Sequence, residues 1–308
     1  MGKYIIKRIL YMIPMLLMVI TAIFLIMSFT PGDPATSVMP ITATQAAKDA
    51  YNASVGWSDS LWVRYLSYLK GLATFNVKSY TTGENIFNEI AIRLPYTLKL
   101  GLISFSLAAI IGISLGIFSA VKQYSFADTF ITILAVFFGS VPSFLMATLF
   151  ILFFAVKLGW FPTFGVYDGW RSYVLPVAAM TLSSIPTLSR MTRSAMLSVM
   201  NMDYVRTARA KGCPESVVIW KHVFKNASLP IITLLVGGFA GIVGGSTILE
   251  QLFTLPGIGN YMLIATNQKN VPVVMTCALL MAFVFMVAMV CMDIFYALID
   301  PKIRQRYQ

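Results

Sequence analysis

The side chains that could do chemistry in this sequence are scattered, and no spacing typical of a nucleotide or metal site occurs. The stretch Gly244–Thr247 reads Gly-Gly-Ser-Thr but lacks the lysine that a phosphate-binding loop places before its hydroxyl residue. No G-x-S-x-G nucleophile turn and no H-E-x-x-H zinc pair is present. The one histidine, His222, lies in a basic stretch and cannot form a metal cluster by itself. The sequence therefore predicts no catalytic residue, no metal and no cofactor bound by this chain.

Groups that could relay a proton are also missing from the apolar segments. Proton-coupled and ion-coupled carriers place carboxylates, lysines or histidines inside their membrane spans. Here Glu250 and Asp293 lie only at the ends of apolar runs. Energy for uphill transport would therefore have to come from another subunit.

The composition is that of a membrane protein. Of the 308 residues, 58% are hydrophobic and only 11% are charged, against roughly 25% charged in an average soluble domain. A soluble fold of this length needs more polar surface, and disordered chains are poor in apolar residues.

Six runs without a charged side chain have about the length, ~20 residues, that a helix needs to cross the hydrocarbon core. They are Ile9–Phe29, Leu100–Val121, Thr129–Val156, Ser172–Ser189, Asn226–Leu249 and Asn270–Met292. Lipid offers no hydrogen-bond partner to the backbone, so each run is expected to be helical. The sequence thus predicts an all-α polytopic membrane protein with six transmembrane helices, the first of them retained as an anchor.

Loop charge sets the expected orientation. With the N-terminus inside, 14 Lys and Arg residues fall in inner segments and 9 in outer segments. Because positive loops stay in the cytoplasm, both termini are predicted to be cytoplasmic. Contact of these loops with anionic lipid explains the net charge of +11 without nucleic acid.

The long segment 31–96 then lies outside the membrane and is rich in aromatic residues. Ser60–Leu72 reads as an amphipathic helix, and the following residues share its apolar side: Leu61, Tyr65, Tyr68, Leu69 and Leu72. Packing of a small cap and contact with a docked partner both fit this pattern.

The inner segment 190–229 is predicted to contain a short isolated helix over Asp203–Lys211, after a continuation of the preceding helix to about Met202. Gly212 can end this helix in a left-handed conformation. Cys213-Pro214 then breaks the chain, with Pro214 as the first residue of a further helix to about Lys225. Such a helix suits docking, with Tyr204 and Val205 as anchors. An ordinary basic loop on lipid headgroups is the alternative.

The stretches Tyr204–Gly212 and Lys221–Pro230 together resemble the cytoplasmic coupling loop of ABC-importer permeases of the oligopeptide, dipeptide and nickel class. Motifs elsewhere carry the same resemblance: Tyr4–Leu10, Phe29–Pro34, Arg93–Leu98, Val141–Phe144, Leu158–Pro162, Gly245–Glu250, Leu255–Gly259 and Asp293–Lys302. The similarity covers nearly the whole chain and is closest to the B-type subunit.

Three departures from the family pattern occur. Arg206-Thr207-Ala208 stands where the general ABC loop has Glu-Ala-Ala, as is usual in the peptide subfamily. Cys213 replaces the usual aliphatic residue, and the outer loop lacks the usual acidic and glycine stretch near 75–80.

The resemblance implies the architecture of a type I importer permease in the cell membrane. Its expected parts are an N-terminal helix (1–30), an outer cap (31–96) and a core (97–308) whose coupling loop covers 196–228. The implied partners are a homologous second permease, two ATP-binding subunits that hold ATP and Mg²⁺, an extracytoplasmic substrate-binding protein and membrane lipid. The implied function is ATP-driven peptide uptake; a nickel–chelator complex or another small solute is the alternative cargo. A channel, a secondary carrier and a membrane scaffold or enzyme are rival classes.

Three groups of site residues are expected from the residues and the resemblance together. The ATPase-docking helix comprises Asp203, Tyr204, Val205, Arg206, Thr207, Ala208, Arg209, Ala210, Lys211 and Gly212. The candidate translocation path comprises Ser140, Pro142, Ser143, Gly241, Gly244, Gly245, Ser246 and Glu250. The candidate gate or outer turn comprises Pro256, Gly257 and Gly259. Helix packing for the small residues and a plain kink at Pro142 are the alternative readings.

Overall fold

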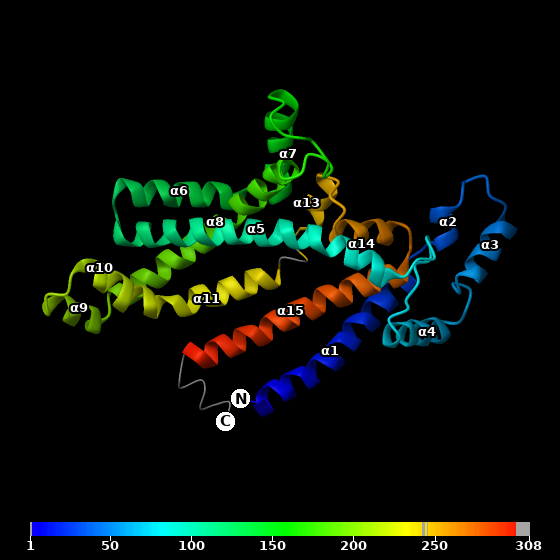
Figure 1. Cartoon of the computed structure of the whole chain (residues 1–308), viewed down its shortest axis with the longest axis horizontal. Helices are drawn as coiled ribbons and strands as arrows, with labels where there is room; N and C mark the ends of the chain where they lie inside the picture. Colours follow the sequence, from blue (N-terminus) through cyan, green and yellow to red (C-terminus); the bar gives the residue numbers. More distant parts are fainter. Residues whose placement is uncertain (1, 242–243, 245, 300–308) are drawn as a thin grey trace. The chain divides into compact units, whose positions relative to one another are not determined.

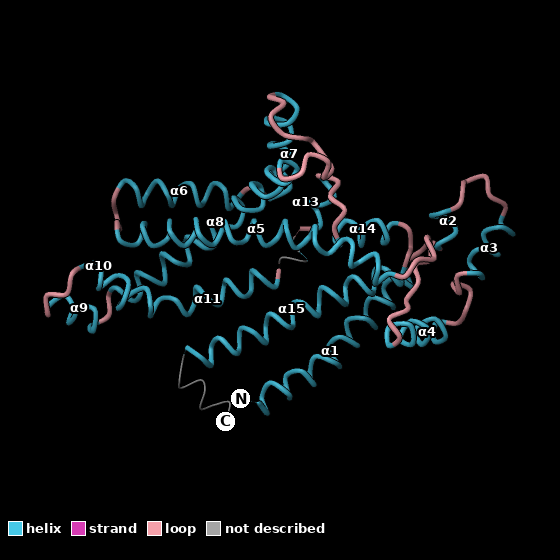
Figure 2. The backbone as a smooth tube through the Cα atoms, in the orientation of Figure 1, coloured by secondary structure: helices cyan, strands magenta, loops and turns pink. Residues whose placement is uncertain are grey.

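The computed structural model describes the backbone of residues 2–241, 244 and 246–299. Within these residues the regular structure is helical, apart from one isolated antiparallel bridge between Lys78 and Asn85. Figure 2 shows helices joined by short loops, with longer irregular stretches between α1 and α5 and after α7. The predicted all-helical class is therefore confirmed for the described part of the chain.

The first, second and sixth predicted runs each correspond to one long helix. These helices are α1 (Gly2–Phe29), α5 (Ile86–Val121) and α15 (Val271–Ile299), drawn in Figure 1. By length and composition, four described segments could cross a membrane: Leu10–Phe29, Ile86–Val121, Glu215–Phe239 and Val271–Met292. A fifth is added if a bent pair of helices counts as one span.

That bent pair lies in the third run, which is helical but broken at Pro142. α6 (Phe126–Ser140) ends there, and α7 (Ser143–Phe150) continues into the π-helix η1 (Ile151–Lys157) at a bend of 94°. Val141 and Pro142 have extended backbones, with ψ of 120° and 141°. Proline has no N–H for the helix and pushes the residue before it out of the helical region.

The fourth run is also a single helix, whereas the fifth is not. α8 (Arg171–Met200) contains the fourth run with both of its prolines inside the helix, and it is absent from the four spans above. It extends to Met200, close to the predicted end. The fifth run is not one helix, because α11 (Lys225–Ala240) is capped by Gly241. Glycine is a poor helix former, and the predicted run contains five of them.

The chain forms two compact units, which are described separately. The first contains the described residues 99–241 and 287–299. In it, α8 packs against α6, α7 and α11, while Thr181 of α8 donates a hydrogen bond to the Ser104 carbonyl of α5 at 3.2 Å. The helix α9 (Asp203–Ala210), the turn α10 (Glu215–Val217) and the π-helix η2 (Val218–Phe224) follow α8.

The second unit contains the described residues 2–98, 244 and 246–286. It holds α2 (Pro34–Val38), α3 (Gln45–Ser54), α4 (Leu61–Ala73), α13 (Thr247–Leu252) and α14 (Ile258–Asn267). Its apolar core joins α1, α4, α14 and the first part of α15. The side chain of Asn270 fixes the turn at 79–81 by accepting from the Tyr80 N–H and donating to Ser79 and Thr81.

The predicted amphipathic helix over Ser60–Leu72 corresponds to α4, with Ser60 at its N-cap. Tyr68 is buried, and its hydroxyl lies 3.2 Å from that of Thr276. Burial raises the pKa of Tyr68 to about 12. Tyr65, Leu69 and Leu72 pack against the same core, but Leu61, expected on that face, is exposed. Internal packing therefore accounts for most of this face.

Candidate functional site

The isolated helix predicted after α8 is present as α9, and it ends as expected at Gly212. Gly212 has a left-handed backbone, with φ of +76°. Its N–H donates to the Arg209 carbonyl at 2.9 Å, and the Cys213 N–H donates to the Ala208 carbonyl at 3.3 Å. This pair of bonds is the Schellman arrangement, which satisfies carbonyls at a helix end and favours glycine.

One face of α9 packs against its own chain. Val205 is fully buried and Ala208 nearly so, in a cluster that also contains Met196, Val218 and Val223. Val205 was expected to be an exposed anchor for a partner. In the structure its side chain is instead packed inside the protein, because α8 and η2 cover that side of α9.

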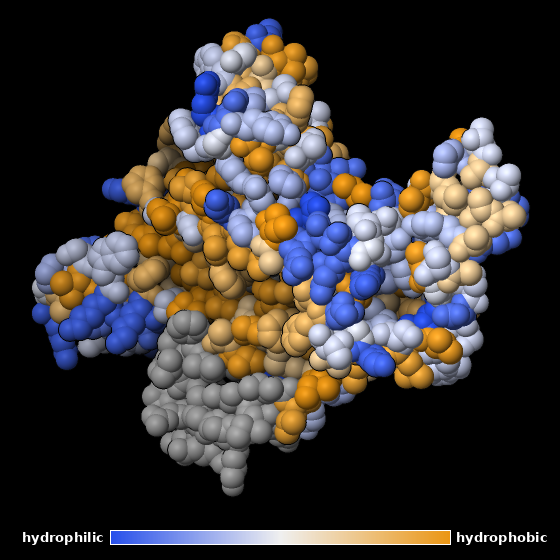
Figure 3. Space-filling view, turned by 45° about the vertical axis from the view of Figure 1, so that its right-hand side comes forward, coloured by the Kyte–Doolittle hydropathy of each residue, from blue (hydrophilic) through white to orange (hydrophobic). Residues whose placement is uncertain are grey.

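The other face of α9 is open and basic. Its exposed residues are Asp203, Tyr204, Arg206, Thr207, Arg209, Ala210, Lys211 and Gly212. Tyr204 is 45% exposed, and the Arg206 side chain is 72% exposed with only a distant acidic neighbour, Asp203, at 3.8 Å. Figure 3 shows hydrophilic side chains gathered over the lobe that α9 and α10 form. This face combines cations with one aromatic ring, a composition suited to a protein surface with acidic and apolar features.

An ion pair holds α9 to the segment that follows it. Arg209 donates to both carboxylate oxygens of Glu215, at 2.7 and 3.1 Å, across the break at Cys213-Pro214. This hydrogen bonding raises the pKa of Arg209. Pro214 is the N-cap of the next helix rather than its first residue, a shift of one position from expectation. α9 and its supporting turn are thereby fixed to each other.

The second candidate region centres on Glu250, whose carboxylate is fully buried. Its Oε1 accepts from the hydroxyls of Thr97, at 2.7 Å, and Ser246, at 2.8 Å. Its Oε2 accepts from the Asn260 N–H at 3.0 Å. The Thr97 oxygen accepts in turn from the Ile258 N–H at 2.9 Å. A buried charge is tolerated when it is hydrogen-bonded in this way.

Two glycines allow this arrangement. A β-carbon on Gly257 would overlap the Glu250 carboxyl group, and one on Gly259 would overlap Thr247. The structure thus brings together Ser246, Glu250, Gly257 and Gly259, with the half-buried Pro256 beside them. Glu250 was expected to line a path, but it has no exposed surface here. Its observed position is that of an internal tie holding the Leu255–Gly259 turn to α5.

Of the remaining expected path residues, Ser140, Pro142, Ser143 and Gly241 belong to the first unit and Gly244 to the second. Ser140 and Pro142 are exposed and Ser143 is half-buried at the α6–α7 bend, where the Ser140 hydroxyl donates to the Val136 carbonyl at 2.8 Å. Gly241 ends α11, and nothing lies within 4 Å of a side chain placed on Gly244. Gly245 lies outside the described residues.

Sequence reasoning missed Thr97 and Asn260 as partners of Glu250. Thr97 belongs to the Arg93–Leu98 motif, but nothing in that motif indicates contact with a residue 153 positions later. Asn260 directly follows the Leu255–Gly259 motif, and its side-chain amide also donates to the Leu255 carbonyl at 3.1 Å. The one feature of the sequence that could have indicated this contact is the polar residue Asn260 next to the glycine-containing turn.

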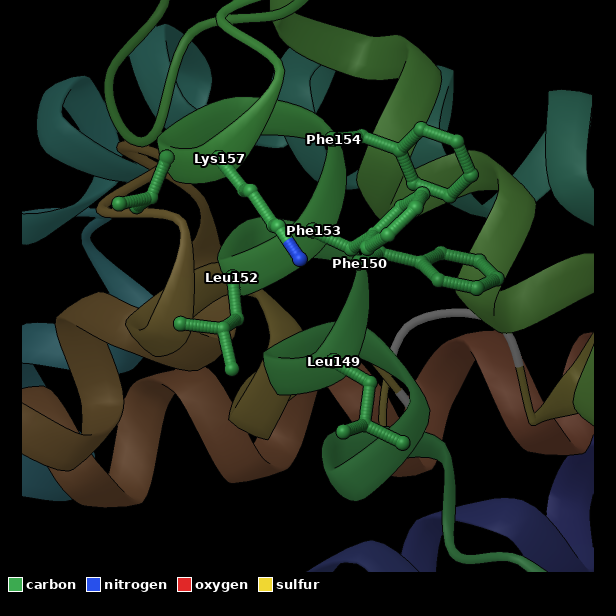
Figure 4. A pocket seen from close by; sticks show the side chains of 7 residues that line it. Leu149, Phe150, Leu152, Phe153, Phe154 and Lys157 are labelled. Carbon is green, nitrogen blue, oxygen red and sulfur yellow. The ribbon is translucent and has the colours of Figure 1, made fainter.

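An open apolar hollow of about 730 Å³ lies on α7 and η1 (Figure 4). Its lining residues are Leu149, Phe150, Leu152, Phe153, Phe154, Val156 and Lys157. The Lys157 ammonium lies 5.8 Å from the Phe153 ring centre. Sites for peptides need several convergent polar groups, and this lining supplies one cation. No cluster of three metal-ligating side chains occurs among the residues that the structure describes.

Two family models together match nearly the whole chain. Residues 112–305 match the binding-protein-dependent transport system inner membrane component, and residues 1–101 match the N-terminal part of such a membrane component.

Characterised relatives align over their full length. The chain is 37% identical to the oligopeptide transport system permease protein AppB of Bacillus subtilis (strain 168), over 98% of this chain and 99% of that protein. It is 34% identical to the oligopeptide permease protein OppB of Salmonella typhimurium and 33% identical to the dipeptide permease protein DppB of Alkalihalophilus pseudofirmus. Both of these alignments cover 99% of this chain and 100% of the relative.

Proposed function

The chain belongs to the family of binding-protein-dependent transport system inner membrane components, and from this premise we propose that it is a permease subunit of an ATP-driven peptide importer. It is a multi-pass protein of the cell membrane and is a transport subunit rather than an ATPase. The observation that carries the cargo class is the end-to-end similarity to permeases of oligopeptide and dipeptide transport systems.

For the topology we propose six spans with both termini in the cytoplasm. The 14 to 9 distribution of Lys and Arg supports this orientation. Counting the bent α6–α7 pair as one span and α8 as another adds two to the four helices above. The proposed parts are the N-terminal helix (1–30), the outer cap (31–96) and the core (97–308) with its coupling loop (196–228).

For the partners we propose a homologous second permease, two ATP-binding subunits and an extracytoplasmic substrate-binding protein. The ATP and Mg²⁺ would be held by the ATP-binding subunits. The exposed face of α9, from Asp203 to Gly212, is the proposed contact with one of them. Its support is the Schellman end at Gly212 and the Arg209–Glu215 pair, which link α9 to the segment that follows it.

For the path we propose that the Pro256–Gly259 turn forms part of the outer gate and that Glu250 supports it from inside. The dense hydrogen bonding of Glu250 supports this role, because it fixes the turn to Thr97 of α5. Ser140, Pro142 and Ser143 at the α6–α7 bend are proposed as path residues, supported by the exposure of Ser140 and Pro142.

The test is uptake by the assembled complex. The chain would be purified together with the homologous second permease and the ATP-binding subunits. The complex would then be reconstituted in liposomes and supplied with its substrate-binding protein. Radiolabelled dipeptides and longer peptides should accumulate only when ATP is enclosed with the ATP-binding subunits. A nickel–chelator complex serves as the competing cargo, and accumulation of the chelate without any peptide would overturn the peptide assignment.

A further inference from the structure

A buried ion pair joins the first turn of α6 to α8. Arg193 donates from Nε to Asp128 Oδ1 and from Nη2 to Oδ2, both at 2.8 Å. The Asp128 side chain is only 5% exposed and that of Arg193 29%. A two-pronged contact of this kind fixes the orientation of both side chains as well as their distance.

Asp128 also holds the end of α5 and the turn between α5 and α6. Its oxygens accept from the Ser119 hydroxyl of α5 and, at 2.9 Å, from the Tyr124 N–H. Tyr124 has a left-handed backbone with φ of +63°, a conformation that is unfavourable for a residue with a side chain. That backbone presents the N–H to the carboxylate. Asp128 therefore ties three segments to Arg193 of α8.

The same helices are in close contact along their length. A β-carbon on Gly112 would lie 2.8 Å from the β-carbon of Leu188, and one on Gly116 would meet Thr192. A β-carbon on Gly139 of α6 would lie 3.2 Å from Pro186. Small residues at such positions let helices approach closely. Close-packed helices shift as units rather than deform gradually.

The C-terminal end of α8, just beyond Arg193, packs against α9. Met196, one turn beyond Arg193, is fully buried in the cluster that contains Val205 and Ala208 of α9. A displacement of α9 is thus transmitted to α8 by packed side chains. The next fixed point along α8 is the Arg193–Asp128 pair.

We propose that Asp128 and Arg193 are positioning residues for transport, forming the joint through which movement of α9 reaches the α5–α6–α8 bundle. This rests on the proposed function. Neither residue belongs to the proposed docking face, path or gate. They convert a displacement of α9 into a shift of three helices together, so their loss should separate ATP hydrolysis from uptake.

The experiment measures both activities on the assembled complex in liposomes, normalised to the amount of complex recovered. Variants Asp128→Asn and Arg193→Lys each weaken the two-pronged contact without removing the side chain. Peptide uptake should fall about tenfold, within the range by which changes along a coupling network act. Peptide-stimulated ATP hydrolysis should stay within about twofold of wild type, so the number of ATP molecules hydrolysed per peptide rises by at least about fivefold.

Lys122→Gln is the matched control. Lys122 is an exposed cation in the same α5–α6 turn, and only its backbone is bonded in the described contacts. Its neutralisation changes the local charge by one unit, as Asp128→Asn also does in the opposite direction, but leaves the Asp128–Arg193 pair in place. This variant should keep the wild-type ratio of ATP to peptide; the same rise in that ratio would mean that local charge alone is responsible and would overturn the proposal.

A purely structural role predicts a different result. Uptake and hydrolysis would then fall in parallel, or neither would change, and either result overturns the proposal.

If the single variants fail to assemble, the double variant Asp128→Asn with Arg193→Gln replaces them, because it leaves no unpaired buried charge. A raised ATP-to-peptide ratio in it supports the joint, while a normal ratio or a failure of the neutral pair to assemble overturns it. Absence of ATP-driven uptake by the wild-type complex is the separate result that would refute the proposed function and this inference with it.

Discussion

At the scale of single residues, Gly212 and Gly257 differ in what a side chain would meet. Gly257 has an ordinary extended backbone, but the Glu250 carboxyl occupies the space of its β-carbon. Gly212 has a left-handed backbone, and nothing lies within 4 Å of its β-carbon position. A substitution at Gly257 therefore acts through a clash inside the chain. A substitution at Gly212 acts through backbone strain and, for a large side chain, through a clash with the proposed ATP-binding subunit.

Gly212→Trp is expected to abolish peptide-stimulated ATP hydrolysis by the complex while leaving membrane insertion intact. The left-handed backbone costs about 1 kcal/mol for any residue with an ordinary side chain, so Gly212→Ala reports this strain alone. Gly212→Asn is the control, since asparagine adopts this conformation more readily. ATP hydrolysis and recovery of complex should follow the order Asn, Ala, Trp. Full activity of the tryptophan variant would refute docking at this position.

Glu250→Ala is expected to destabilise the protein by about 3 kcal/mol or more, because the Thr97 and Ser246 hydroxyls and the Asn260 N–H would all lose their acceptor. Glu250→Gln keeps one acceptor oxygen and should lose less. Thermal unfolding of the complex in detergent measures the difference. Glu84→Gln, which changes an exposed carboxylate of the outer cap, should leave the unfolding temperature unchanged. An unchanged unfolding temperature for the alanine variant would contradict the tie.

The sequence singled out Glu250 as a candidate path residue but did not indicate its surroundings. Its position at the end of an apolar run suggested a polar side chain near a path, whereas the structure buries it completely. Burial depends on Thr97 and Asn260, and neither contact follows from local periodicity. Gly212 was predictable because the left-handed end of a helix is a local property of the chain.

At the scale of elements, the prolines show why the sequence predicts where an apolar run lies but not whether its helix is straight or broken. Pro142 breaks its run at 94°, while Pro176 and Pro186 lie inside the continuous helix α8. Composition gives the extent of a run, but tertiary contacts decide whether a proline bends it. The close approach of Gly139 to Pro186, just before the break, is a contact of this kind.

The two faces of α9 lead to opposite expectations for neighbouring residues. Tyr204→Ala should weaken binding of the ATP-binding subunits by about tenfold without changing the unfolding temperature, because Tyr204 is exposed and aromatic side chains dominate such contacts. Val205→Ala should lower the unfolding temperature, because it leaves a space beside Met196 and Val218. Titration of solubilised permease with the ATP-binding subunits measures the first effect. The assignment of the two faces fails if the two variants exchange these effects.

At the scale of the whole molecule, the described chain forms two units that two helices connect in sequence. α5 contributes residues up to Leu98 to one unit and from Lys99 to the other, and α15 changes unit at Val287. The predicted division at residue 96 lies near the first of these points and near the end of the N-terminal family match at residue 101. That residues 246–286 pack in the same unit as residues 2–98 could not be predicted, because it depends on long-range contacts such as Tyr68 with Thr276.

The chain alone is expected to accumulate no solute. A hundredfold gradient requires about 2.8 kcal/mol for each molecule moved, and the sequence contains neither a phosphate-binding lysine loop nor a charged residue within its six apolar runs to supply it. Purified chain in liposomes with ATP, or with an imposed proton or sodium gradient, should bring labelled peptide to equilibrium at most. The complete complex in matched liposomes should exceed equilibrium when ATP is present. Concentration of peptide by the chain alone would show that it holds its own energy-coupling site and that its movement is not driven through α9.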